Sequence, residues 1–191
     1  MGALVLGYPL PLVPGQIIWL NLVTDGFLDV SLAMEPKEKG LLKGRFERPK
    51  KYLVDSSMLQ RIPGMAITMM IGSLLLFRAT YEDDLMRGWT ITLTTLAIFQ
   101  WFNAWNCRSE NTSIFKQNPF ANKFLVGATV IVIGLQILAV HAPFMNHILR
   151  TTPLTIGEWM LAAAVATSII FAEEARKYVA RNVRERRWRF A

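Results

Sequence analysis

The sequence predicts an all-α membrane protein, a bundle of about five transmembrane helices in which one ion-binding helix is broken. Hydrophobic residues make up 52% of the 191 residues, more than is usual for a soluble domain. They are gathered into blocks, and the charged residues lie between the blocks, as in proteins that cross a bilayer several times. One block also contains a carboxylate and other polar groups, which a helix facing only lipid would not carry.

Each element of the bundle follows from the length of an apolar block. A helix rises about 1.5 Å per residue, so roughly 20 residues cross the hydrocarbon core. Short polar connections join the blocks, and we treat residues 1–191 as a single transmembrane domain with a basic tail at residues 173–191. The five predicted spans are residues 12–34, 62–79, 89–106, 124–141 and 155–172.

The positions of lysine and arginine predict the orientation. Most of them lie in the connection 35–61 and in the tail, whereas the connection 80–88 carries mainly acidic residues. Basic connections stay on the cytoplasmic side, so we expect the connection 35–61 and the tail to be cytoplasmic. The first span then enters from the outer or lumenal side, and Met1–Gly7 is interpreted as the end of an earlier span.

Composition also argues against several other classes of protein. The net charge of +7 arises from residues beside apolar blocks, which favours a membrane surface over nucleic acid as the partner. Cys107 is the only cysteine, so an internal disulfide and a cysteine-based zinc site are both excluded.

The first span contains the polar cluster that carries the functional prediction. Asn21, Thr24 and Asp25 are spaced i, i+3 and i+4, which places them on one face of a helix. An aspartate at mid-span costs about 2.5–3.5 kcal/mol on insertion scales. Amide, hydroxyl and carboxylate oxygens are hard ligands, so the cluster predicts a site for Ca²⁺ or a similar cation. The alternative is a polar cluster that only joins helices by hydrogen bonds.

Gly26 and Asp29, which follow the cluster, add detail to the predicted cation site. Gly26 weakens the helix, and we expect a local break there that frees backbone carbonyls. Asp29 lies one turn beyond Asp25. It either lines a cytoplasmic access path, pairs with a basic residue, or simply lies near the membrane boundary.

The strings NLVTDG and SLAMEP in the first span closely resemble the sixth transmembrane helix of type II P-type cation ATPases, the family of the calcium and sodium/potassium pumps. The preceding PLPLVPGQIIWL resembles the approach to that helix. The later NAWNCRSENTSIF resembles the end of the eighth helix. The resemblance extends over nearly the whole chain, from the end of the family's fifth helix through its tenth.

The resemblance implies a set of cation ligands. In the family, the residues that correspond to Asn21, Thr24 and Asp25 coordinate the transported ion. Gln100 takes the place of a glutamate of the two-site pumps, which leaves one negative charge fewer and is closer to single-site relatives. The family often has a proline soon after the TDG string, in a pattern like TDG-x-P-A, whereas this chain has Phe27, Leu28 and Asp29 there.

The resemblance further implies partners. The family's DKTGT and GDGxND strings do not occur in this sequence, and phosphoryl transfer needs the groups that they supply. We therefore expect ATP and Mg²⁺ to act only through missing actuator, phosphorylation and nucleotide domains, which would join this chain together with the earlier helices. No catalytic residue and no cofactor-binding residue is assigned here. Whether the chain counts as an enzyme stays open, because alone it should not hydrolyse ATP.

Two alternative functions are compatible with this pattern of spans. The chain could be a stand-alone membrane interaction or regulatory protein derived from such a pump, with no transport of its own. A small secondary transporter is the weaker alternative, because such folds use paired inverted repeats and this chain shows none.

Three further polar features are expected to be structural. Gln136 in the fourth span is interpreted as a helix-packing contact, and Glu158 as a side chain that reaches toward the headgroups. The basic tail is interpreted as a solvated anchor on the cytoplasmic side.

Overall fold

The computed structural model describes residues 2–36, 56–109 and 112–189, and within these residues the chain is helical with no β-strand. The predicted all-α fold class is therefore confirmed. The basic residues of segment 37–55, on which much of the orientation argument depends, lie outside the described residues.

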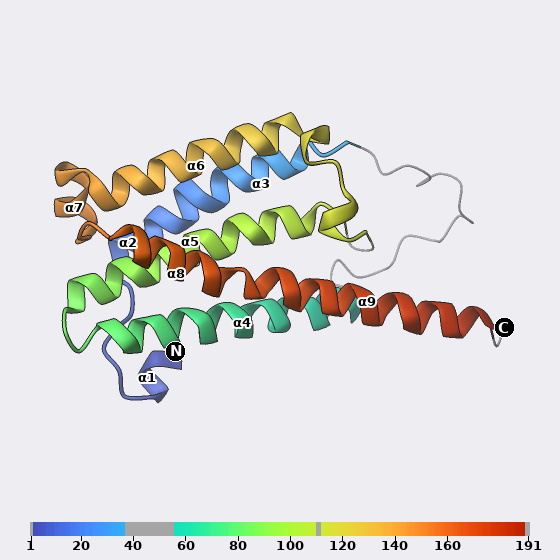
Figure 1. Ribbon diagram of the computed structural model, residues 1–191, viewed down its shortest axis with the longest axis horizontal. Helices are drawn as coiled ribbons and strands as arrows, with labels where there is room; N and C mark the ends of the chain where they lie inside the picture. Colours follow the sequence, from blue (N-terminus) through green and yellow to red (C-terminus); the bar gives the residue numbers. More distant parts are fainter. Residues whose placement is uncertain (1, 37–55, 110–111, 190–191) are drawn as a thin grey trace.

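Long helices run alternately up and down the bundle (Figure 1). The end that carries α7 (Pro143–Leu149) is called the α7 end, and the opposite end, from which the C-terminal helix projects, is called the tail end. Short elements lie at the N-terminus and between α5 and α6; they are α1 (Gly2–Val5), η2 (Ile114–Lys116) and η3 (Pro119–Ala121). The bundle itself consists of α2 (Pro14–Trp19), η1 (Leu20–Asp25), α3 (Gly26–Ala33), α4 (Ser56–Thr80), α5 (Leu85–Cys107), α6 (Lys123–His141), α8 (Ile156–Ala166) and α9 (Ser168–Arg189).

Five helical stretches overlap the five predicted spans, because α2, η1 and α3 form one continuous stretch and α9 follows α8 directly. The last stretch runs on to Arg189, well beyond residue 172. Three helices in the described part are long and apolar enough to cross a membrane: Arg61–Thr80, Lys123–His141 and Ile156–Val179. The other two segments, residues 14–33 and α5, carry more polar side chains, such as Asp25 and Gln100. Five crossings thus stay a prediction.

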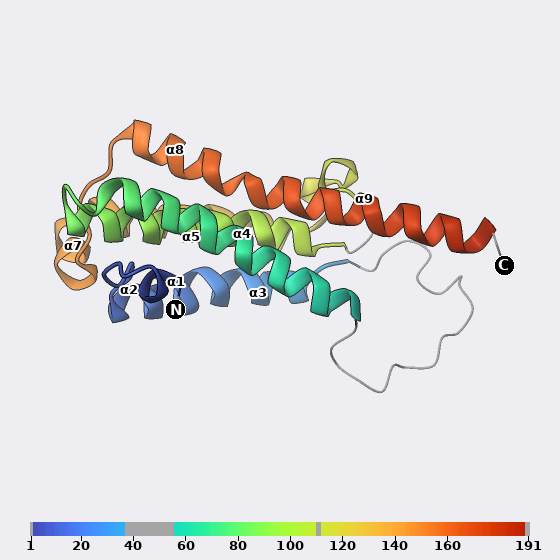
Figure 2. The ribbon, with the colours of Figure 1, turned by 90° about the horizontal axis from the view of Figure 1, so that it is seen from below.

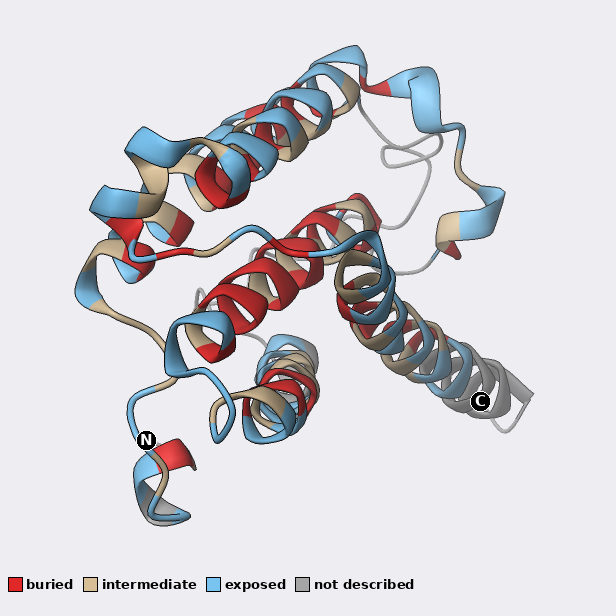
Figure 3. Cartoon of the chain, turned by 60° about the vertical axis from the view of Figure 1, so that its left-hand side comes forward, coloured by how far each residue is buried: buried red, intermediate tan, exposed pale blue. Residues whose placement is uncertain are grey.

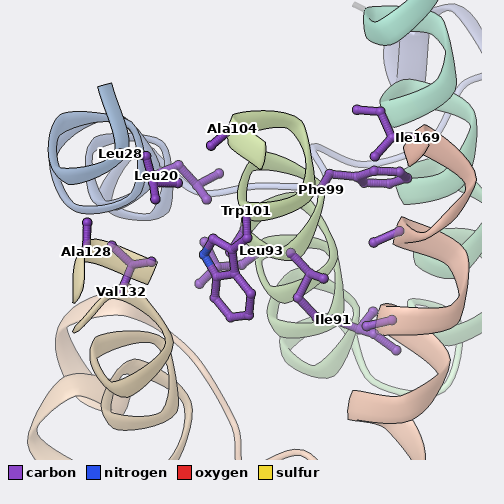
Figure 4. Close-up of a cluster of buried hydrophobic side chains, with 14 of the residues drawn as sticks. Leu20, Leu28, Ile91, Leu93, Phe99, Trp101, Ala104, Ala128, Val132 and Ile169 are labelled. Atoms are coloured by element: carbon purple, nitrogen blue, oxygen red, sulfur yellow. The ribbon is translucent and has the colours of Figure 1, made fainter. Parts of the chain in front are cut away.

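The helix α5 forms the centre of the bundle. It contacts α4, α8 and α9 on one side and η1, α3 and α6 on the other, so Figure 2 shows α2–α3 and α8–α9 on opposite sides of it. Its side chains are buried along most of its length (Figure 3). In Figure 4, Phe99 points toward α4 and α9, whereas Trp101 points toward α6. A core built around one central helix fixes the neighbours that surround the candidate site.

Gly72 allows three helices of this core to approach closely. A Cβ atom at this position of α4 would lie 2.7 Å from Cζ of Phe99 in α5 and 2.9 Å from Cγ1 of Val165 in α8. Both distances are shorter than normal carbon contacts, so the packing of α4, α5 and α8 depends on the missing side chain.

Polar contacts join the helices nearer the α7 end. The indole nitrogen of Trp19 donates to Gln136 Oε1 at 3.0 Å, and Gln136 Nε2 donates to Thr94 Oγ1 at 3.3 Å. Gln136 is buried, so its interpretation as a helix-packing contact is confirmed. The interpretation of Glu158 needs correction, because its carboxylate pairs with Arg87 and accepts the backbone N–H of Thr155.

The tail begins inside the bundle. Glu173 and Lys177 of α9 are both buried, and Lys177 Nζ donates to the backbone oxygens of Asn106 and Thr112, each at 3.2 Å. The interpretation of the tail as a solvated anchor is therefore wrong for Lys177. The cause is that α9 continues straight from α8 and packs against the end of α5.

Candidate cation site

The break predicted at Gly26 is not found; instead, a π-helical segment precedes that residue. The segment η1 spans Leu20–Asp25 and contains Asn21, Thr24 and Asp25. Gly26, where the sequence predicts the break, has ordinary helical angles, φ −55° and ψ −48°. A π segment bonds from residue i to i+5, and such segments occur frequently at functional sites. The chain thus changes its helical geometry at the predicted ligands without unwinding there.

Thr24 lies on the packed face of this stretch. The residues with the same orientation, Leu20 and Leu28, point toward Ala104 of α5 in Figure 4. Thr24 is four residues from each of them and is 2% exposed. Its hydroxyl group is therefore held at the contact between the first span and α5.

Asn21, Asp25 and Asp29 form a second stripe with a spacing of four residues. Asn21 and Asp29 are exposed, and Asp25 is half-buried. The opposite side of α3 borders a groove of about 540 Å³ against α6, lined by Gly26, Phe27, Val30 and Ser31 of α3 and by Met34 just after it. At about 100° per residue, Asp25 and Asp29 point away from this groove. The acidic stripe therefore faces away from α6.

Gln100 lies beside the same contact. It precedes Ala104 by one helical turn, so it shares the side of α5 that faces the first span. Its Oε1 atom is buried and accepts no hydrogen bond from the described residues. A buried acceptor without a donor is costly, and an ion or a water molecule would satisfy it. This observation fits Gln100 as an oxygen ligand.

The four predicted ligands differ in their burial. Thr24 is buried, Asp25 and Gln100 are half-buried, and Asn21 is exposed. Within the described residues, no hydrogen bond joins any two of these four side chains, and no group of three or more His, Cys, Asp or Glu residues could hold a metal. Ca²⁺ takes six to eight oxygen ligands. The predicted ligands on this chain could supply only part of such a set, so the cation site stays a prediction here.

One polar cluster was missed by the sequence analysis. At the tail end, the carboxylate of Glu35 is bound by Arg108 and Asn122. The sequence did contain a signal for this cluster. Glu35 follows the predicted span 12–34 and Arg108 follows the predicted span 89–106, so two opposite charges were expected at the same end of the bundle. These positions could have suggested the ion pair between Glu35 and Arg108. They do not indicate that Asn122 donates a hydrogen bond to the same carboxylate.

Comparison with known proteins identifies the family. A family model described as "Cation transporting ATPase, C-terminus" matches residues 9–179, so this chain belongs to that family. It is similar to the "Calcium-transporting ATPase" of Bacillus subtilis, with 34% identity over 86% of the chain and 19% of the relative. "Calcium-transporting ATPase 1" of Yarrowia lipolytica is 27% identical over 92% of the chain and 19% of the relative.

A third relative is the "Probable cation-transporting ATPase F" of Mycobacterium tuberculosis, 29% identical over 88% of the chain and 19% of the relative. The chain thus spans about a fifth of the length of these relatives. It corresponds to their C-terminal membrane portion, and the predicted resemblance to P-type cation ATPases is confirmed.

Proposed function

We propose that this chain supplies part of the intramembrane cation site and translocation path of a P-type cation-transporting ATPase. Asp25, Thr24 and Gln100 provide a carboxylate, a hydroxyl and an amide oxygen beside the contact between the first span and α5. Asn21 completes the set once another helix covers its exposed face. The transported ion is Ca²⁺ or a cation of similar ligand preference, as the printed names of two relatives indicate.

The observation that carries this proposal is the buried Oε1 atom of Gln100, which has no donor among the described residues. Had the polar cluster served only to join helices, its amide would be expected to pair with a neighbouring helix, as Gln136 does with Trp19 and Thr94. The acidic stripe supports the same conclusion, because an exposed Asp29 and a half-buried Asp25 need a partner within the bilayer.

The partners follow from the incomplete ligand set. The remaining oxygen ligands would come from earlier helices of a longer pump, and ATP and Mg²⁺ would act through its actuator, phosphorylation and nucleotide domains. In the proposed orientation, the connection 35–61 and the tail are cytoplasmic and the α7 end is lumenal or external. A stand-alone interaction protein is the alternative that the experiment below distinguishes.

The experiment replaces the matching C-terminal region of the Bacillus subtilis relative with this chain and measures ATP-dependent ⁴⁵Ca²⁺ uptake into membrane vesicles. Asp25→Asn keeps the size of the side chain and removes its charge, so uptake should fall to background. Asp83→Asn is the matched control, because it makes the same chemical change in an exposed turn between α4 and α5. The amount of each variant in the vesicles is measured by immunoblot.

Gln100→Leu should raise the calcium concentration needed for half-maximal uptake by more than tenfold, since a ligand is removed. Normal uptake by both Asp25→Asn and Gln100→Leu, at equal protein amounts, would contradict the proposal and favour the interaction protein.

A further inference from the structure

At the tail end, one carboxylate connects three helices. Arg108, which follows α5, donates from Nε and Nη2 to Glu35 Oε1 at 3.0 and 2.8 Å. Asn122, the N-cap of α6, donates from Nδ2 to Glu35 Oε2 at 2.8 Å. Glu35 lies two residues after the end of α3. These three residues, called the Glu35 cluster, therefore join the ends of α3 and α5 to the start of α6.

The geometry of the Glu35 cluster is that of a strong ion pair. The Arg108 side chain is 3% exposed, and its guanidinium lies 5.3 Å from the centre of the Trp105 ring. Arg108 Nη2 also donates to the backbone oxygen of Asn118 at 3.1 Å. Charge-assisted arginine–carboxylate pairs are geometrically specific. Because the Arg108 side chain is buried, removal of the half-buried Glu35 carboxylate would leave its charge uncompensated.

Asn122 extends this connection to the helices themselves. Its Nδ2 atom also donates to the backbone oxygen of Ser31 in the last turns of α3, at 2.9 Å. Its Oδ1 atom accepts the backbone N–H of Leu125 at 2.9 Å and so caps α6. These hydrogen bonds thus fix the end of α3 relative to α6, both in its rotation about the helix axis and in its position (height) along that axis.

The segment that carries Arg108 and Asn122 is itself braced by the C-terminal helix. Lys177 Nζ donates to the backbone oxygens of Asn106 and Thr112, and the backbone N–H of Ile114 donates to Glu174 Oε1 at 2.9 Å. These contacts hold the chain between α5 and α6 against α9. The Glu35 cluster therefore has a fixed support.

We infer that Glu35, Arg108 and Asn122 are positioning residues that set the rotation and height of α3 and thereby the position of Asp25. This inference rests on the proposed function. Asp25 and Glu35 are ten residues apart, or about 15 Å along a helix. The helix α3 joins them without interruption through Ala33, so a shift at Glu35 is carried to the π segment. The cluster touches no transported ion and acts only through α3.

The test uses the chimeric pump described above and measures the calcium dependence of uptake. Glu35→Gln and Arg108→Gln should each raise the half-saturating calcium concentration by about 2- to 30-fold, the range that mutations along a contiguous network produce. Maximal uptake at saturating calcium should change little, which a general loss of folded protein would not allow. The double variant should be no worse than the more affected single variant, because both remove the same interaction.

Lys123→Gln is the matched control, because it removes an exposed charge next to Asn122 and should leave the calcium dependence unchanged. If Glu35→Gln does not accumulate in the membrane, Glu35→Asp, which keeps the charge and shortens its reach, gives the same readout. An unchanged half-saturating concentration in these variants would overturn the positioning role, as would additive effects in the double variant. The proposed function itself fails only if both Asp25→Asn and Gln100→Leu leave uptake normal, so the two failures are distinguishable.

Discussion

Gly72→Ala is expected to destabilise the bundle, although alanine is a better helix former than glycine. The new methyl group would lie 2.7 Å from Phe99 Cζ and 2.9 Å from Val165 Cγ1. The nearer atom belongs to a fully buried ring in the central helix, so it has little room to move. The helices α4, α5 and α8 must therefore separate slightly to admit the methyl group.

The magnitude follows from two opposing effects. Overpacking of a well-packed core costs about 1–3 kcal/mol. The gain in helix propensity from glycine to alanine is about 1 kcal/mol. Gly127 in α6 provides the matched control, because a Cβ atom there has no neighbour within 4 Å. Gly127→Ala gains the propensity without the clash, so the free energies of unfolding of the two variants should differ by about 1–3 kcal/mol.

The assay is thermal unfolding of the chain in detergent micelles, followed by far-ultraviolet circular dichroism. For a chain of this size, the difference corresponds to a separation of about 2–12 °C between the two midpoints. Equal midpoints for Gly72→Ala and Gly127→Ala would refute the close approach of α4, α5 and α8 at Gly72.

Three further predictions use the same unfolding assay. Gln136→Leu removes the partner of Trp19 and Thr94 and should lower stability by about 1–2 kcal/mol, whereas the exposed change Ile137→Val should have little effect; equal stabilities would show that these hydrogen bonds contribute nothing. Lys177→Met removes the charged donor to the backbone oxygens of Asn106 and Thr112 and should cost about 1.5–3 kcal/mol, whereas the exposed Lys116→Met should cost less than about 0.5 kcal/mol; a harmless Lys177→Met would contradict its buried role. Asp25→Asn should leave the isolated chain as stable as before or more stable, because function and stability often oppose each other at such sites, and a marked loss of stability would assign Asp25 a structural role.

The positions of the helices could be predicted from the sequence because insertion depends on local composition. An apolar block of about 20 residues predicts α6 closely, with 124–141 against Lys123–His141, but α9 runs on to Arg189, far beyond the predicted end at residue 172. Break positions were less predictable. The sequence indicates Gly26 as the weak point, whereas the irregular geometry occupies the six residues before it. A π segment depends on how the helix packs against α5, and no local pattern specifies that packing.

Because packing against α5 is not specified by a local pattern, the sequence predicted which residues form the polar cluster but not which of them are buried. A period of 3.6 residues places Asn21, Thr24 and Asp25 on one face. In the π segment, Thr24 is buried against α5 while Asn21 is exposed. Lys177 shows a related limit, since counting basic residues predicts which side of the membrane the tail occupies but not that one lysine would enter the bundle.

The acidic stripe of Asn21, Asp25 and Asp29 affects the free energy of the bundle within a membrane. If Asp25 faced lipid near mid-span, it would cost about 2.5–3.5 kcal/mol on insertion scales. Interhelical hydrogen bonds in membranes contribute about 0.6 kcal/mol on average, so a few of them would not offset this carboxylate. Because the described residues leave this stripe partly uncovered, a further helix or a bound cation is needed to stabilise it. Under the proposed function, the chain is expected to be most stable when the ligands and helices that complete the proposed cation site are present.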